Sequence, residues 1–198
     1  MKRRSLLIAL PALWLAGCAT PEAQPDRYFR LSLAPPKPRQ PLPARLIIEP
    51  FEVQGLYADR AMVYRAADGS YQQYHHQNWI AAPSQMFTSD LVAALSATYG
   101  AASAFPASSR LEGEVTVRGR VRRLERLLDG GGARAALALS LAVTTRGGQL
   151  LGSIEFEREL EAGKTINDYV AAQAQLCTLA YDQLFDLLDQ QISTLARR

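Results

Sequence analysis

Cysteine and histidine are scarce in this sequence. Its 198 residues include only two cysteines, Cys18 and Cys177, and two histidines, His75 and His76. So few cysteines exclude a disulfide-rich scaffold and a multi-cysteine zinc site. The two histidines are adjacent on a predicted strand, so their side chains point to opposite faces and do not chelate one ion together. We therefore expect no metal site.

Enzyme motifs are missing as well. There is no Gly-x-Ser-x-Gly elbow to present a serine nucleophile. The glycine run 130–132 is not followed by the Lys-Ser/Thr of a phosphate-binding loop, and it lies between predicted strands. Asp59 and Arg60 form a polar pair that suits a turn better than a catalytic centre. We expect a non-enzymatic protein with no catalytic residue and no cofactor.

The sequence has no apolar run long enough to cross a bilayer. The run from Leu6 to Leu15 is well short of the roughly 20 residues that a membrane-spanning helix needs. Lys2, Arg3 and Arg4 precede it, and Leu15-Ala16-Gly17-Cys18 follows with the small residues of a lipobox. This order predicts a lipoprotein signal peptide over residues 1–17 and a covalent lipid on Cys18. An ordinary signal peptide with an incidental cysteine is the alternative.

The mature chain carries no net charge. Removal of the leader leaves 19 basic residues against 19 acidic ones, so the mature protein is formally neutral. Neutrality excludes the basic footprint of a nucleic-acid-binding protein. Cys177 is then a lone thiol on the apolar side of a predicted helix, where a buried, inert cysteine is the common state. The remaining 181 residues fit one domain.

Residues 18–26 are short, polar and proline-containing, which is typical of a flexible tether. Ala19 follows the lipidated cysteine, where enteric bacteria place aspartate to retain a lipoprotein in the inner membrane. By that sorting rule we expect the protein at the periplasmic face of the outer membrane, held there by its lipid anchor.

The domain occupies residues 27–198. Alternation, turn residues and helix caps predict its elements in this order: a strand over 28–33, a proline-rich surface connector over 35–43, strands over 45–53, 61–65 and 70–79, a helix over 83–98, an antiparallel meander over 111–128, 135–143 and 150–160, and a helix over 165–196. The proline-rich run is alternatively a docking peptide. The order favours a single-domain α/β sandwich, with a mixed or mainly antiparallel sheet covered by two principal helices.

A family resemblance covers residues 27–95. It is carried by the following residues: Ile47-Ile48-Glu49-Pro50, Gly55, Tyr57-Ala58-Asp59-Arg60, Met62-Val63-Tyr64-Arg65, Tyr71, Tyr74, Asn78-Trp79, Pro83 and Met86. Together they resemble the ABC-type transport auxiliary lipoproteins, the lipoprotein components of MCE systems. The sequence departs from that family at His75-His76-Gln77, where an arginine is expected directly before Trp79.

The resemblance implies a function and partners. It implies an outer-membrane lipoprotein that docks an MCE-domain protein of an ABC-type transporter, with lipid as cargo and ATP hydrolysis on a separate subunit. It also implies that the protein forms a homo-oligomer. The alternative functions are a periplasmic lipid-binding shuttle and an assembly lipoprotein of another outer-membrane machine.

Aromatic and arginine residues gather between residues 57 and 79. Tyrosine, tryptophan and arginine are the residue types enriched at interface hot spots. Alternation along strands divides the group between core and surface, with Tyr64 and Trp79 expected in the core. The candidate partner-binding residues are Tyr57, Arg60, Arg65, Tyr71 and Tyr74.

Overall fold

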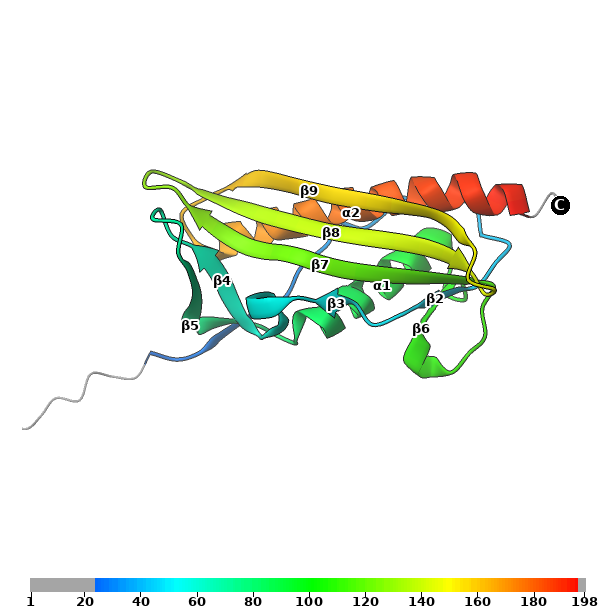
Figure 1. The fold of residues 1–198 in the computed structure, drawn as a ribbon, viewed down its shortest axis with the longest axis horizontal. Coiled ribbons are helices and arrows are strands. Elements are labelled where there is room, and N and C mark those ends of the chain that lie inside the picture. Colours follow the sequence, from blue (N-terminus) through cyan, green and yellow to red (C-terminus); the bar gives the residue numbers. More distant parts are fainter. Residues whose placement is uncertain (1–23, 196–198) are drawn as a thin grey trace, which may run out of the picture.

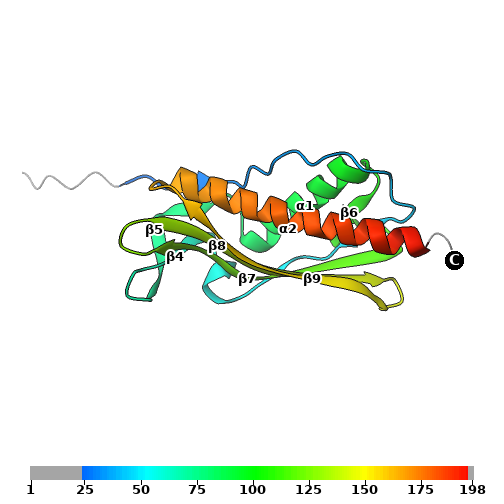
Figure 2. The same cartoon turned by 90° about the horizontal axis from the view of Figure 1, so that it is seen from above.

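A large curved sheet and two helices form the two layers of this protein (Figures 1 and 2). The computed structural model describes residues 24–195, so Cys18 and the predicted signal peptide lie outside the described residues. The α/β sandwich expected from the sequence is confirmed. Its elements are β1 (Arg27–Phe29), β2 (Leu46–Ile48), β3 (Glu52–Val53), the 3-10 helix η1 (Gly55–Ala58), β4 (Ala61–Arg65), β5 (Tyr71–Trp79), α1 (Pro83–Tyr99), β6 (Ala104–Pro106), the 3-10 turn η2 (Ala107–Ser109), β7 (Val115–Leu128), β8 (Ala133–Thr145), β9 (Leu150–Ala162) and α2 (Ile166–Leu195).

Strand β7 organises the sheet. On one side it pairs with β8 in antiparallel fashion along its whole length, and β8 pairs with β9 in the same way, which confirms the predicted meander. On the other side the short strands β2, β3 and β4 follow one another, all parallel to β7. Beyond them, β6 pairs with β2, and β5 and β1 continue from β4. The sheet is therefore mixed.

Local sequence features fix the ends of several elements. At the β4–β5 hairpin, Gly69 adopts a φ of +85°, and the Asp68 carboxylate accepts a hydrogen bond from the Ser70 amide at 2.9 Å. Pro83 occupies the first turn of α1, where its missing N–H costs no hydrogen bond. A capping box precedes α2, since Thr165 and Asp168 each accept a hydrogen bond from the other's amide.

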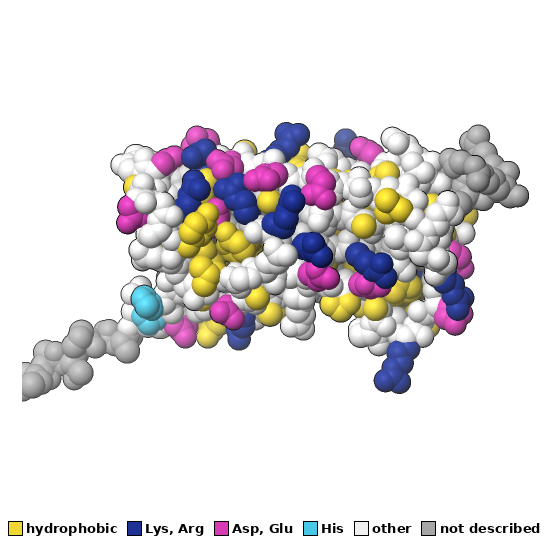
Figure 3. All heavy atoms as spheres, in the orientation of Figure 1, with side chains coloured by type: hydrophobic (Ala, Val, Ile, Leu, Met, Phe, Trp, Pro, Cys, Tyr) yellow, Lys and Arg dark blue, Asp and Glu magenta, His cyan; other side chains and the backbone are white. Residues whose placement is uncertain are grey.

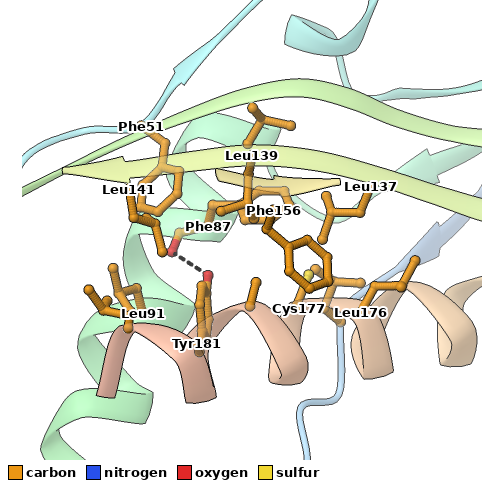
Figure 4. Packing of buried hydrophobic residues seen from close by; sticks show 14 of the residues in the cluster. Phe51, Phe87, Leu91, Leu137, Leu139, Leu141, Phe156, Leu176, Cys177 and Tyr181 are labelled. Atoms are coloured by element: carbon orange, nitrogen blue, oxygen red, sulfur yellow. Dashed lines mark hydrogen bonds between the residues drawn. The ribbon is translucent and has the colours of Figure 1, made fainter. Parts of the chain in front are cut away.

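The core lies between the sheet and the two helices. Phe87 of α1 and Tyr181 of α2 meet there under the strands, and the Tyr181 hydroxyl donates to the Phe87 carbonyl at 3.3 Å (Figure 4). Cys177 is fully buried in this layer, and burial raises the pKa of its thiol far above the usual value. The expected burial of Cys177 is thus confirmed. Side chains fill the space between the layers, as Figure 4 shows.

The proline-rich connector belongs to a longer extended segment, residues 30–44, which we call the strap. It crosses over the two helices on the side away from the sheet (Figure 2). Within the strap the Leu31 side chain is buried, and the Arg39 amide donates to the Thr98 carbonyl at the end of α1. The Arg39 guanidinium lies 2.7 Å from both Asp186 and Asp189 of α2. The strap therefore connects both helices, as expected of a surface connector.

Two strand predictions differ from the structure, and one short strand was not predicted. The first strand ends at Phe29, because the chain then leaves the sheet to become the strap. The strand expected over 45–53 is interrupted at Pro50 and Phe51, where Phe51 instead exchanges hydrogen bonds with Thr88 and Ser84 of α1. Strand β6 has only three residues and contains a proline, so its sequence carries no strand pattern.

Within residues 24–195, no helix combines the length and the hydropathy that crossing a bilayer requires.

Candidate partner-binding face

The sheet face that points away from the helices, which we call the outer face, carries part of the predicted site. The register places Arg65 opposite Tyr71 and Val63 opposite both Gln73 and Glu125, so these side chains share one face. Helix η1 lies beside them, and the Leu56 carbonyl accepts a hydrogen bond from the side-chain amide nitrogen Nε2 of Gln73 at 3.3 Å.

An exposed group of residues results, which we call the aromatic ridge. Leu56 is 46% exposed and Tyr71 is 47% exposed, although both are large and apolar in most of their surface. Figure 3 shows a group of hydrophobic side chains on this part of the outer face. The ridge consists of Leu56, Tyr57, Arg65 and Tyr71.

Tyr57 also has a structural role. Its hydroxyl donates a short hydrogen bond to the Glu125 carboxylate, which is completely buried on β7. Burial, together with this carboxylate, raises the pKa of Tyr57 well above its ordinary value. The second oxygen of Glu125 accepts from Arg123 at 3.0 Å. Tyr57 therefore fastens η1 to β7 while its ring forms part of the ridge.

Ion pairs cover the rest of the outer face. Arg123 of β7 reaches over β8 to Glu157 and Glu159 of β9, at 3.0 and 3.1 Å. The middle strand has Ala136 and Ala138 at these positions, and both are buried under the arginine although they belong to the outer face. Figure 3 shows basic and acidic side chains next to one another in this region. The ridge is thus bordered by charges that are neutralised within the chain.

The structure places two of the candidate residues elsewhere. Tyr74 belongs to the opposite face of β5, where its ring lies 4.5 Å from that of Tyr64 and its hydroxyl accepts from Arg126 at 3.2 Å. Arg60 lies near β1, with its guanidinium 5.1 Å from the centre of the Tyr28 ring. Tyr57, Arg65 and Tyr71 are brought together, whereas Arg60 and Tyr74 are not part of the ridge. Trp79 is buried as expected, while Tyr64 is only partly buried.

Sequence reasoning missed Leu56 and Glu125. Leu56 stands alone in a turn, and no periodic pattern distinguishes it from a buried leucine. Glu125 carries no clear signal either, because it is followed by Arg126 and the pair has the sequence of an ordinary exposed ion pair.

Open apolar grooves occur on the helix side of the molecule. One groove of about 690 Å³ lies between the start of the strap and α2 and is lined by Phe29, Val170, Ala174 and Leu179 among others. A second groove of about 670 Å³ follows α1, between Pro50 and Pro106.

Close to the first groove, Asp90 lies in a separate hollow under the strap. One of its carboxylate oxygens is buried without a hydrogen-bond partner.

In the described part of the chain, no three Cys, His, Asp or Glu side chains are grouped as a metal ion would require. His76 instead lies with its Nδ1 2.9 Å from the Asp26 carboxylate.

The fold is a single-domain α/β sandwich, and its outer face carries an exposed aromatic ridge beside a group of ion pairs. The chain belongs to the ABC-type transport auxiliary lipoprotein component family, whose model matches residues 29–184. It is similar in structure to protein XCC0632 from Xanthomonas campestris, a member of family DUF330. That match has 19% identity and a TM-score of 0.68 and covers 85% of this chain and 99% of the other.

A second solved structure, of an uncharacterized protein, matches with 22% identity and a TM-score of 0.65, covering 81% of this chain and 97% of the other. At these identities the two structures support the fold alone. No curated protein matches this chain.

Proposed function

We propose that this protein is a non-enzymatic lipoprotein at the periplasmic face of the outer membrane, anchored by a lipid on Cys18. There it docks an MCE-domain protein of an ABC-type lipid transport system. Membership of the transport auxiliary family supports the association with a transporter. The observation that carries the docking role is the aromatic ridge, where half-exposed Leu56 and Tyr71 lie beside Arg65.

The ridge has the composition of a protein-binding surface. Tyrosine and arginine are enriched among the few residues that supply most of the binding energy at interfaces, and the charges that border the ridge are already paired within the chain. A second copy of the chain is a further partner for this face, since the resemblance implies a homo-oligomer. A separate subunit hydrolyses ATP in this proposal.

A lipid shuttle is the second candidate, and the groove beside α2 is the observation that favours it. The interior between sheet and helices is filled by side chains, so a carried lipid would lie in this open groove, largely in contact with water. An open groove shields an acyl chain poorly, which is why docking is the preferred function.

Site-specific crosslinking in cells tests the proposal. A photoreactive amino acid replaces Tyr71 in the full-length protein, and the matched control replaces Leu111, which is 45% exposed but lies outside the ridge. We expect position 71, and not position 111, to capture the MCE-domain protein, and Cys18→Ser to abolish the capture. No capture of the transporter from position 71 although it is expressed, together with lipid crosslinks from Leu179 in the groove beside α2, would favour the shuttle instead.

A further inference from the structure

Three side chains form an exposed group on one side of β1, which we call the tether patch: Tyr28, Arg60 and Ile80. Tyr28 and Ile80 are each 50% exposed, although both are largely apolar. The Ile80 amide donates to the Phe29 carbonyl at 2.8 Å, which joins the end of β5 to β1. Arg60 donates to the Trp79 carbonyl at 3.2 Å and covers the Tyr28 ring. Backbone pairing and a cation–π contact thus fix the patch in one arrangement.

The patch lies where the chain enters the fold. Strand β1 begins at Arg27, nine residues after Cys18. Nine residues span at most about 30 Å when fully extended. A lipid on Cys18 would therefore hold this part of the domain close to the bilayer, whatever the path of the connecting chain.

The chemistry of the patch suits a lipid surface. Tyrosine is enriched at membrane interfaces, because its ring is apolar and its hydroxyl remains in the headgroup layer. Arginine extends its charged end to lipid phosphates while its stem lies along apolar surface. Of the neighbouring acids, Asp26 is engaged by His76, and Asp59 is exposed beside Arg60. Arg60 is thus the basic residue of the patch, on the same side of β1 as Tyr28.

We propose that the tether patch rests on the lipid surface that receives the anchor, and that this contact sets the orientation of the domain. The inference depends on the lipid anchor of the proposed function and adds a second attachment to it. A weak contact is sufficient, because a short tether gives an effective concentration of roughly millimolar. A dissociation constant in that range keeps the patch on the membrane for about half of the time.

Spin-label accessibility tests the proposal on the full-length lipidated protein in phosphatidylethanolamine–phosphatidylglycerol vesicles. A nitroxide is attached at Ile80→Cys and, as the control, at Leu150→Cys, which is 59% exposed. Leu150 begins β9, at the opposite end of the molecule from β1 (Figure 1). The native Cys177 is fully buried and does not compete for the label.

We expect vesicles to protect the label at position 80 from a water-soluble nickel complex at least several-fold, with little change at position 150. Tyr28→Ser should reduce the protection without releasing the protein from the vesicles. Equal nickel access at both positions on protein that floats with vesicles would overturn the tether patch alone. Failure to float would overturn the lipid anchor and, with it, this inference.

Discussion

Two carboxylates are removed from water in this fold, and their surroundings differ. Glu125 is completely buried but receives hydrogen bonds from Tyr57 and from Arg123. Asp90 is less deeply buried, yet one of its oxygens has no hydrogen-bond partner. Arg30 is the nearby cation that acts on it. A buried charge costs little when it is fully paired and much more when it is not, so the two residues should respond oppositely to neutralisation.

Tyr57→Phe removes one hydrogen bond from a buried carboxylate and leaves the ring in place. We expect a loss of about 1–3 kcal/mol in the free energy of unfolding, because the Glu125 oxygen remains without a donor. Urea denaturation followed by circular dichroism measures it. The matched control is Tyr64→Phe, whose hydroxyl bonds to the exposed Gln72 at 2.6 Å and should cost much less. Equal losses in both variants would contradict a structural role for Tyr57.

The buried Asp90 carboxyl group should make the stability of the folded protein depend on pH. Burial raises the pKa of its carboxyl to about 6 in the folded protein, from roughly 4 in an unfolded chain. The folded state therefore binds the proton more tightly, and this group lowers stability as the pH rises from about 4 through about 6. Asp90→Asn cannot ionise, so it should become the more stable protein by about 1 kcal/mol near pH 7, after allowance for partial solvent screening.

Thermal unfolding of both proteins at pH 4.5 and pH 7.5 measures this difference. The control is Asp182→Asn, an exposed position on α2. A stability gain from Asp90→Asn that is the same at both pH values would contradict ionisation as its cause.

At the scale of elements, the meander could be predicted and the parallel pairings could not. Strands β7 to β9 are joined by glycine turns, so alternation and turn residues in neighbouring segments define them. The pairing of β2, β3 and β4 with β7 joins residues more than 60 positions apart, such as Leu46 and Val115. Local patterns carry no information on such contacts, which depend on how the whole sheet closes.

The alanines of β8 have a specific role in that sheet. Because Ala138 is small, Arg123 lies across it to reach Glu157. Ala138→Leu should displace the arginine and destabilise the protein by about 1–3 kcal/mol, the usual cost of overpacking. Ala142→Leu is the matched control, because its neighbour Arg118 pairs with Glu49 on the other side of β7 and does not cross β8. Similar unfolding midpoints for both leucine variants would contradict this role.

At the scale of the whole molecule, the fold class and the family could be predicted from the sequence. The candidate partner-binding face could be predicted only in part. The fold class follows from the order of strands and helices over residues 27–198, and the family follows from residues 27–95, where short motifs keep a characteristic order. Tyr71 and Tyr74 are three residues apart on one strand, and this odd spacing already implies opposite faces. The position of Arg60 could not be foreseen, because it depends on the pairing of β1 with β5, whose partner residues are 50 positions apart in the sequence.

The parallel pairing of β1 with β5 has a mechanical consequence for an anchored protein. A pull on the tether acts along the axis of β1, so the bonds between Arg27–Phe29 and Gln77–Trp79 are loaded together in shear rather than opened one by one. The strap behind β1 is in turn secured at Leu31 and Arg39. A force on the tether would thus be distributed over β1, the strap and both helices rather than borne by the three residues of β1 alone.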